Sequence, residues 1–219
     1  MRALVTGATR GIGLELVNRM RARGDSVLGT LRAGGVAPDA GDWDELDVTD
    51  PGSVHALAGR HPAPLDLLVC NAGVYLDKLN QLDTGFPAEM WAQTFAVNVT
   101  GVFLTVQAFL PQLRAAPAAR IAIIGSQMGS DTRAPGGSFI YRASKAAALN
   151  LGRNLASELQ PEGIAVGVYH PGWVQTDMGG TAADITVEES ATGLIQRFDE
   201  LTLDRTGCFL CWDGREHPY

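Results

Sequence analysis

The chain has 219 residues, 46% of them hydrophobic and 19% charged, which suits one domain with a sizeable core. Its net charge of -7 excludes the overall field expected of a protein that binds nucleic acid or an anionic membrane. The sequence holds no apolar run of about 20 residues, and its N-terminus lacks the apolar core of a signal peptide. We therefore expect a cytoplasmic protein without nucleic-acid or membrane partners.

Short β-rich runs alternate with amphipathic helical stretches along the chain. Strands are predicted at 2–7, 26–31, 43–48, 65–70, 120–126, 164–172 and 207–212. Helices are predicted at 13–24, 53–60, 87–116, 139–160 and 186–201. The third of these helices is expected to bend near Asn98 and Pro111. Apolar strands that alternate with helices predict an α/β fold: a single Rossmann domain over 1–219, doubly wound, with a mostly parallel seven-stranded sheet and helices on both faces.

A glycine-rich loop, "VTGATRGIGLEL", lies between the first predicted strand and the first helix. Gly7, Gly11 and Gly13 allow a sharp turn and a close approach of the backbone to a pyrophosphate, while the helix N-terminus offers free N–H groups. The spacing is G-x-x-x-G-x-G rather than the common G-x-G-x-x-G. Because the strand–loop–helix context is the required one, we interpret the loop as a nucleotide site rather than a merely tight turn.

The residues after the second strand indicate which nucleotide is bound. An NAD site typically has an acidic residue about 20 residues after the glycine loop. Here the strand ends with Thr30 and Arg32, and no carboxylate follows until Asp39. Together with Arg10, these side chains suit a ribose 2′-phosphate, which guanidinium groups bind with paired hydrogen bonds. NADP(H) is therefore preferred, and NAD(H) is the alternative if Arg32 is merely solvated.

The stretch "YRASKAAALN" places Tyr141 four residues before Lys145 at the start of a helix. Four residues make about one turn, so both side chains share a face. An ammonium beside a phenol lowers the pKa of the phenol, which makes a proton donor that works near neutral pH. The alternative is an exposed lysine next to a packed tyrosine.

Other reactive side chains carry no separate function. Cys208 and Cys211 form a C-x-x-C inside a predicted strand, where residues three apart point to opposite faces. No second cysteine pair completes a zinc site, so no metal is expected. His170 is expected to be packed, and no G-x-S-x-G elbow surrounds Ser126 to suggest a hydrolase.

The motifs occur in one order along the chain: "TGATRGIG", "CNAG", Asn98, Ser126, "YRASK" and "HPGWVQT". In this order they resemble the short-chain dehydrogenase/reductase family over essentially the whole chain. The tail, with "PGWVQTDMGG" and "GCFLCWDGREHPY", is similar to the small carbonyl reductase branch that includes the sniffer proteins and bacterial C-factor. One departure is Cys70, which replaces the first asparagine of the usual N-N-A-G.

The resemblance implies a role for each catalytic residue. Tyr141 would donate a proton, Lys145 would lower the pKa of Tyr141 and hold the nicotinamide ribose, Ser126 would bond the substrate carbonyl, and Asn98 would fix a water. The glycine loop, the second strand and the resemblance together assign these further residues to the cofactor: Gly7, Thr9, Arg10, Gly11, Ile12, Gly13, Thr30, Arg32, Asp47, Val48, Asn71, Ala72, Gly73, Pro171, Gly172, Val174 and Thr176.

The resulting prediction is an NADPH-dependent oxidoreductase that reduces an aldehyde or ketone to an alcohol. The alternatives are a nucleotide-binding regulator of C-factor type and an NAD-linked alcohol dehydrogenase. The segment between Thr176 and Thr186 is short, which predicts a small lid and an open site for a small-molecule carbonyl or alcohol. The aromatic residues of the third predicted helix are expected in the core or in a subunit interface, and the resemblance implies a homodimer or homotetramer.

Overall fold

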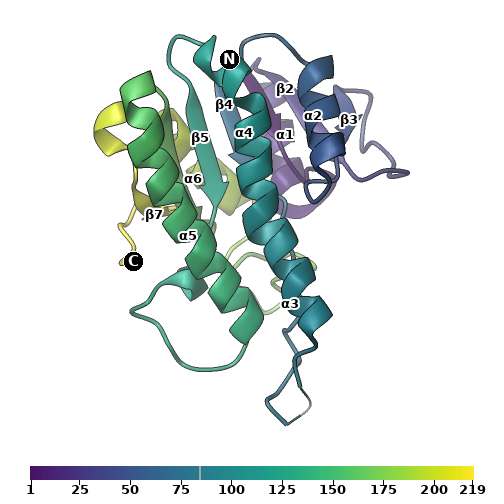
Figure 1. Ribbon diagram of the computed structural model, residues 1–219, viewed down its shortest axis with the longest axis vertical. Helices are drawn as coiled ribbons and strands as arrows, with labels where there is room; N and C mark the ends of the chain where they lie inside the picture. Colours follow the sequence, from purple (N-terminus) through teal and green to yellow (C-terminus); the bar gives the residue numbers. More distant parts are fainter. Residues whose placement is uncertain (84) are drawn as a thin grey trace.

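The computed structural model describes residues 1–83 and 85–219, and its centre is one seven-stranded sheet (Figure 1). The strands are β1 (Arg2–Val5), β2 (Ser26–Leu31), β3 (Trp43–Glu45), β4 (Leu67–Cys70), β5 (Arg120–Ile124), β6 (Ala165–His170) and β7 (Phe209–Cys211). Their order is β3-β2-β1-β4-β5-β6-β7, and every neighbouring pair is parallel. The predicted doubly wound Rossmann sheet is confirmed, with all seven strands parallel.

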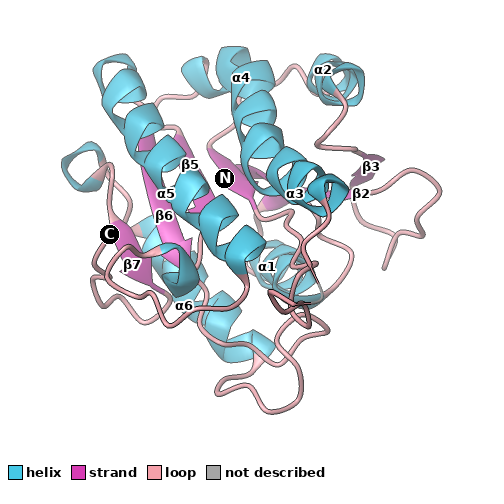
Figure 2. Cartoon of the chain, turned by 60° about the horizontal axis from the view of Figure 1, so that its bottom comes forward, coloured by secondary structure: helices cyan, strands magenta, loops and turns pink. Residues whose placement is uncertain are grey.

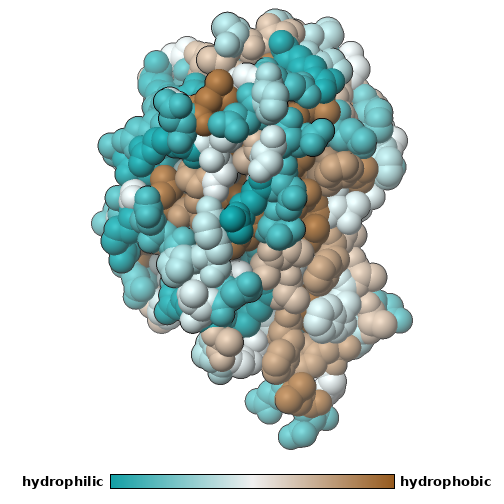
Figure 3. All heavy atoms as spheres, turned by 60° about the vertical axis from the view of Figure 1, so that its left-hand side comes forward, coloured by the Kyte–Doolittle hydropathy of each residue, from teal (hydrophilic) through white to brown (hydrophobic). Residues whose placement is uncertain are grey.

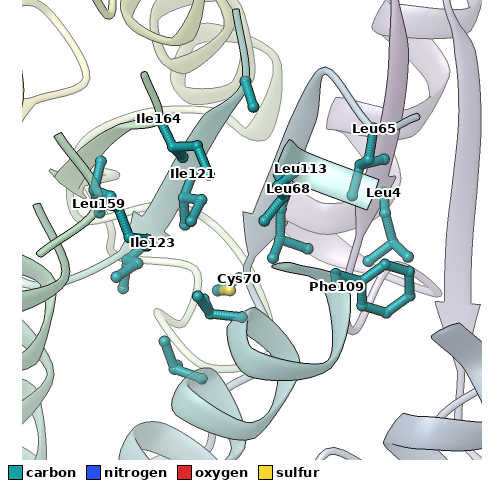
Figure 4. Packing of buried hydrophobic residues seen from close by; sticks show 14 of the residues in the cluster. Leu4, Leu65, Leu68, Cys70, Phe109, Leu113, Ile121, Ile123, Leu159 and Ile164 are labelled. Carbon is teal, nitrogen blue, oxygen red and sulfur yellow. The ribbon is translucent and has the colours of Figure 1, made fainter. Parts of the chain in front are cut away.

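Helices cover both faces of the sheet. They are α1 (Gly11–Ala22), α2 (Pro51–Arg60), α3 (Ala88–Phe95), α4 (Gly101–Arg114), α5 (Phe139–Leu159) and α6 (Val187–Asp199). Side chains of α2, α4 and α5 share one core cluster with the sheet, and those of α1 and α6 share the other. In the first cluster Phe109 of α4 lies against the strand residues Leu4 and Leu68 (Figure 4). Each such side chain, removed from water, contributes roughly 1.5–3 kcal/mol to folding.

The predicted helix 87–116 consists of two α-helices joined by a π-helical turn, Ala96–Thr100. The expected interruption near Asn98 is confirmed by this π-turn, whereas Pro111 lies inside α4 without ending it. By length and composition alone the run Ala88–Arg114 matches a membrane span, but a core helix passes the same test, and α4 contacts α2, β4 and β5. A π-turn adds one residue to the helical ladder and is frequent at functional sites.

The aromatic residues of this helical run divide between interior and surface. Phe109 is 1% exposed, whereas Trp91 and Phe103 are 37% and 42% exposed. The core part of the prediction is therefore confirmed for Phe109, and the interface part stays a prediction.

Several predicted strands end earlier than expected, and the residues beyond their ends form loops. Residues 6–7, 125–126 and 171–172 follow β1, β5 and β6. Since all strands are parallel, their carboxyl ends meet at one edge of the sheet, the lower edge in Figure 1 that comes forward in Figure 2. The strand order reverses between β1 and β4, which is where such folds bind ligands.

Candidate active site

The glycine loop is held tightly against the segment that follows β4. Gly7 has φ +62°, and a Cβ atom there would lie 2.9 Å from the Cα of Ala72. At Gly13 a Cβ would lie 2.5 Å from Nδ2 of Asn71 and 2.6 Å from the Gly7 carbonyl oxygen. Only glycine fits this cradle, and the first turn of α1 opens directly from it. The loop therefore presents backbone N–H groups where a pyrophosphate would bind.

Asn71 and Thr6 lock together the turns after β1 and β4. Nδ2 of Asn71 donates to the carbonyl oxygens of Thr6 at 2.9 Å and Gly7 at 3.0 Å. Oγ1 of Thr6 accepts from the backbone N–H groups of Asn71 and Ala72, both at 3.0 Å. The role of Thr6 could not be predicted, because a threonine at a strand end carries no sequence signal of which distant N–H groups it will meet.

The end of β2 provides the residues proposed for the ribose phosphate. Thr30 is 1% exposed, and its Oγ1 accepts from the Gly7 N–H at 3.1 Å, so its hydroxyl supports the glycine loop. Arg32 is exposed. Asp39, the first carboxylate after β2, accepts from Nε1 of Trp43 at 2.7 Å and from Arg21 at 3.0 Å. Its carboxylate is thus already bonded elsewhere.

Two more predicted cofactor residues follow β3. Oδ1 of Asp47 accepts from the hydroxyl of Thr49 at 2.7 Å and from its N–H at 2.9 Å. These bonds, with the charge of Arg32, keep the pKa of Asp47 below its usual value. Val48 is buried against Gly101 at the start of α4. The Asp47 carboxylate is therefore held in place as an exposed acceptor.

Arg10 and Thr176 connect the glycine loop to the segment after β6. Nη1 of Arg10 lies 2.6 Å from Oδ2 of Asp177 in an exposed ion pair. Cγ2 of Thr176 would be 3.3 Å from a Cβ placed at Gly11. The segment after β6 therefore lies over the loop, and Arg10 is paired with a carboxylate rather than standing free for a phosphate.

The remaining lid residues are fixed by neighbouring chain segments. The Pro171 carbonyl accepts from Oγ of Ser190 at 2.6 Å. Gly172 has φ +90°, and a Cβ there would be 2.4 Å from Cδ1 of Ile185. Val174 forms an isolated bridge with Ile185 and is 4% exposed. These contacts give the short segment one defined path across the strand ends.

Tyr141 and Ser126 meet at the carboxyl end of β5. Oγ of Ser126 accepts from the Met128 N–H at 3.1 Å, and the Ser126 side chain lies beside the phenol of Tyr141. Tyr141 is 7% exposed. Burial raises the pKa of Tyr141 to about 12, although the Ser126 hydroxyl opposes the shift. The phenol is therefore neutral at pH 7 and can donate a proton.

Lys145 lies close to Tyr141 but does not lower the pKa of its phenol. Nζ of Lys145 is 5.7 Å from the Tyr141 ring centroid and donates to the Ile124 carbonyl at 2.8 Å. Burial lowers the pKa of Lys145 to about 8. The expectation of a lowered phenol pKa is thus wrong for this structure, because burial dominates and the ammonium points to a carbonyl.

Asn98 ties the π-turn to the segment after β4 and to α5. Its Oδ1 accepts from the Val74 N–H at 2.8 Å, and its Nδ2 donates to the Val74 carbonyl at 2.9 Å and to Oγ of Ser144 at 3.0 Å. A Cβ at Gly73 would lie 3.4 Å from Oδ1 of Asn98 and 3.7 Å from Nζ of Lys145. Asn98, Lys145 and Gly73 are therefore neighbours, and both amide protons of Asn98 are used inside the protein.

Tyr75 is a site residue that the sequence did not indicate. Its ring stacks on that of Tyr141, with centroids 4.2 Å apart and an angle of 22° between the planes. A tyrosine two residues after "CNAG" matches no motif, so only the fold reveals this contact.

Large apolar side chains are exposed on several segments that follow the carboxyl ends of the strands. Those that are exposed in the segments after β4 and β6 and at the starts of α3 and α5 are Leu76, Leu79, Leu82, Trp91, Phe139, Trp173 and Met178. On the face shown in Figure 3, apolar atoms gather in the lower part of the molecule, while the upper part is mostly hydrophilic. On this face the side that carries the strand ends is therefore the more apolar one.

His170 and the cysteines lie apart from this chemistry. His170 is 8% exposed beside the His217 ring, and burial lowers its pKa to about 4. Cys208 and Cys211 are free thiols. Across residues 1–83 and 85–219, no group of three or more His, Cys, Asp or Glu side chains could hold a metal ion.

Comparison with known proteins identifies the family. The profile described as short chain dehydrogenase matches residues 1–185. The C-signal protein of Myxococcus xanthus is 38% identical over 159 residues, which cover 71% of this chain and 93% of that protein.

Two solved structures show the same fold over the full chain. A crystal structure of NADPH-bound carbonyl reductase from chicken fatty liver has a TM-score of 0.90 and 32% identity, and covers 100% of this chain and 98% of its own. The carbonyl reductase Sniffer of D. melanogaster has a TM-score of 0.92 and 26% identity, with 100% and 99% coverage. The chain therefore belongs to the short chain dehydrogenase family and resembles the sniffer and C-signal proteins within it.

Proposed function

We propose that this protein is an NADPH-dependent reductase of aldehyde or ketone carbonyls. The observation that carries the proposal is the buried, neutral phenol of Tyr141 at the carboxyl end of β5, with Ser126 and Lys145 beside it. The exposed apolar side chains near the strand ends, such as Trp173 and Met178, favour substrates with apolar substituents over highly charged ones.

The cradle formed by Gly7 and Gly13 fits a dinucleotide, because a side chain there would fill the space against Ala72 and Asn71. The cofactor would supply the hydride that adds to the carbonyl carbon. The glycine loop would hold its pyrophosphate and Lys145 its ribose. Exposed Arg32 would meet the 2′-phosphate, and the NADPH in the chicken carbonyl reductase supports this choice.

Negative charge develops on the carbonyl oxygen as the C=O π bond breaks. Ser126 and Tyr141 are donors already in place for that charge, which is where preorganised hydrogen bonds contribute most. Tyr141 then transfers its phenolic proton to the oxygen, which gives the alcohol product and the phenolate of Tyr141. Lys145, with its pKa near 8, can return a proton to the phenolate at neutral pH.

The first experiment measures initial rates of cofactor oxidation with a panel of aldehydes, ketones and diketones, with NADPH and NADH in parallel. Turnover with NADPH supports the proposal. Tyr141→Phe keeps the ring but removes the proton, so turnover should fall about 100- to 10,000-fold. Near-full turnover in this variant, in folded protein that binds NADPH, would contradict the mechanism.

A second candidate is a regulator whose main property is nucleotide binding, favoured by the 38% identity with C-signal. A binding protein needs no buried proton donor, so the contact between Ser126 and Tyr141 speaks for catalysis. Measured NADPH binding without turnover of any carbonyl in the panel would favour the regulator.

An NAD-linked alcohol dehydrogenase is the weaker alternative. Oxidation needs the phenolate of Tyr141 as base, and a pKa of about 12 disfavours that form at neutral pH. Comparable rates at pH 7 for reduction with NADH and for alcohol oxidation with NAD⁺ would favour it.

A further inference from the structure

Asp77 is a buried carboxylate with no place in the chemistry described above. It lies in the segment after β4 and is 0% exposed. Within residues 1–83 and 85–219 no other aspartate or glutamate is buried. A buried charge costs free energy unless donors satisfy it, so its partners should reveal its purpose.

The partners of Asp77 are the first free N–H groups of α5. Oδ2 of Asp77 accepts from the Ile140 N–H at 2.8 Å, and Oδ1 accepts from the Tyr141 N–H at 3.2 Å. With Ser138 at the N-cap, these are the second and third residues of the helix. An N-cap side chain normally bonds to N–H groups at those two positions. Asp77 therefore caps α5 from 61 residues upstream of Ser138 — a long-range substitute for the usual local cap.

Ser138 cannot provide that cap itself. It has φ +49° and ψ 41°, in the left-handed region, whereas a capping serine is normally extended. Its hydroxyl instead bonds the phenol of Tyr75, whose ring stacks on Tyr141. The segment Tyr75–Asp77 thus contacts the catalytic tyrosine at its ring, through the neighbouring Ser138, and at its backbone N–H.

We propose that Asp77 is a positioning residue for Tyr141, which it serves by fixing the first turn of α5 so that the phenol keeps its place against Ser126. This role of Asp77 rests on the proposed reductase function only in the experiments that measure turnover. Asp77 is buried and its carboxylate bonds the backbone of α5, so it would act through Tyr141.

The negative charge of Asp77 also acts on the phenol. Tyr75, Asp77 and Lys145 are the titratable groups that the described structure places against Tyr141. Burial is the largest cause of the raised pKa of Tyr141, and Tyr75 and Asp77 add to it. Removing the charge should therefore allow the phenol to ionise at lower pH. Asparagine is nearly as large as aspartate, so the burial of Tyr141 should be kept and the shift should report the lost charge.

Asp77→Asn tests the proposal. Asparagine keeps the shape, but it presents an NH₂ group to one of two N–H donors, so only one cap bond survives. Turnover should fall about 10- to 100-fold, since small misplacement of a catalytic group has effects of that size. The alkaline limb of the reduction rate should move to lower pH, while the KM for NADPH stays close to that of the unchanged protein.

Asp50→Asn is the matched control. Asp50 caps α2 through the Gly52 N–H at 2.8 Å, far from Tyr141 in the fold, and has no place in the site. Its variant should show the wild-type turnover and pH profile. A folded Asp77→Asn protein with turnover and pH profile like those of Asp50→Asn would overturn the proposal.

Two further measurements do not depend on turnover. Ultraviolet difference spectra at about pH 10.5, close to the ordinary phenol pKa, measure the ionisation of all tyrosines in each protein. The same spectra after Tyr141→Phe give the part that is due to the other tyrosines. Tyr141 should ionise more in Asp77→Asn than in the unchanged protein. In one outcome the unchanged protein shows no turnover while Asp77→Asn still increases the ionisation of Tyr141 in these spectra. That pair of results would reject the reductase function but keep the positioning role of Asp77.

Hydrogen exchange in the unchanged protein covers the case in which Asp77→Asn does not fold. The Ile140 and Tyr141 amides should be protected, unlike ordinary first-turn amides. The amides of Ile12 and Gly13 hold the same two positions in α1 and provide the reference. Equal exchange rates in the two helices would show that no working cap exists and would reject the proposal.

Discussion

The nucleotide side and the catalytic side of this site are built from different materials. Around β1 and β4 the geometry depends on glycines and neutral hydrogen bonds, such as those of Thr6 and Asn71. Around β5 and α5 it depends on buried ionisable side chains: Tyr141, Lys145 and Asp77. A backbone constraint requires glycine at a given position, whereas a side-chain contact between distant residues requires no particular sequence pattern. The nucleotide side is therefore easier to predict from a sequence. It is also less sensitive to pH, because its hydrogen bonds are neutral.

The strongest way to break the nucleotide side is Gly13→Ala. The added Cβ would lie 2.6 Å from the Gly7 carbonyl, so the loop must move. We expect NADPH affinity to fall at least about 100-fold, or about 2.7 kcal/mol, in a fluorescence titration. Gly59→Ala, at a helical position with open space, is the control and should bind normally. Unchanged affinity in Gly13→Ala would show that the cradle does not hold the cofactor.

Thr6→Val should uncouple the turns after β1 and β4. It leaves the Asn71 and Ala72 N–H groups without their acceptor, at a cost of roughly 2–4 kcal/mol. Urea denaturation measures this loss. Thr192→Val removes an exposed hydroxyl from α6 and should change stability by less than about 0.5 kcal/mol. Equal effects of the two variants would contradict the assigned role of Thr6.

His170 should make the catalytic side sensitive to acid. Its pKa is about 4 in the fold, against an ordinary value of 6.5, so between these pH values the unfolded chain binds more protons. Stability should therefore fall as the pH drops from 7 to 5, by roughly 1–2 kcal/mol from this group. In His170→Gln the loss should shrink, and an identical pH dependence of the unfolding midpoint would reject the contribution.

Arg32→Ala addresses cofactor choice and should have the smallest effect. Loss of one guanidinium–phosphate contact should reduce the preference for NADPH over NADH about tenfold, measured as the ratio of kcat/KM values. Arg19→Ala, which removes an ion pair with Glu15 on α1, should leave that ratio unchanged. An unchanged ratio in Arg32→Ala would show that residues other than Arg32 contact the 2′-phosphate.

The fold class and the seven strands could be predicted from the sequence, because apolar strands alternate with helices along the chain. The sequence also located Ser126, Tyr141 and Lys145, since their motif spacing is fixed by one helix and one strand end. Strand ends were predicted too long, because apolar residues continue into the turns that carry the site.

The contacts of Tyr75 and Asp77 could not be predicted in the same way. In the sequence they belong to a loop of mixed polarity, and only the packing of that loop on α5 gives them partners. The pKa of Tyr141 was predicted in the wrong direction for a related reason. The spacing to Lys145 was visible, but the degree of burial was not.

The parallel sheet also separates the molecule into a working edge and an edge that is free for engineering. Gly163, in the turn that leads from α5 to β6, lies opposite the strand ends that bear the site, and a side chain there would meet open space. A reporter domain or surface linker inserted at this turn would project away from the cofactor loop and the lid. The protein could thus be immobilised or labelled there with its site facing solution.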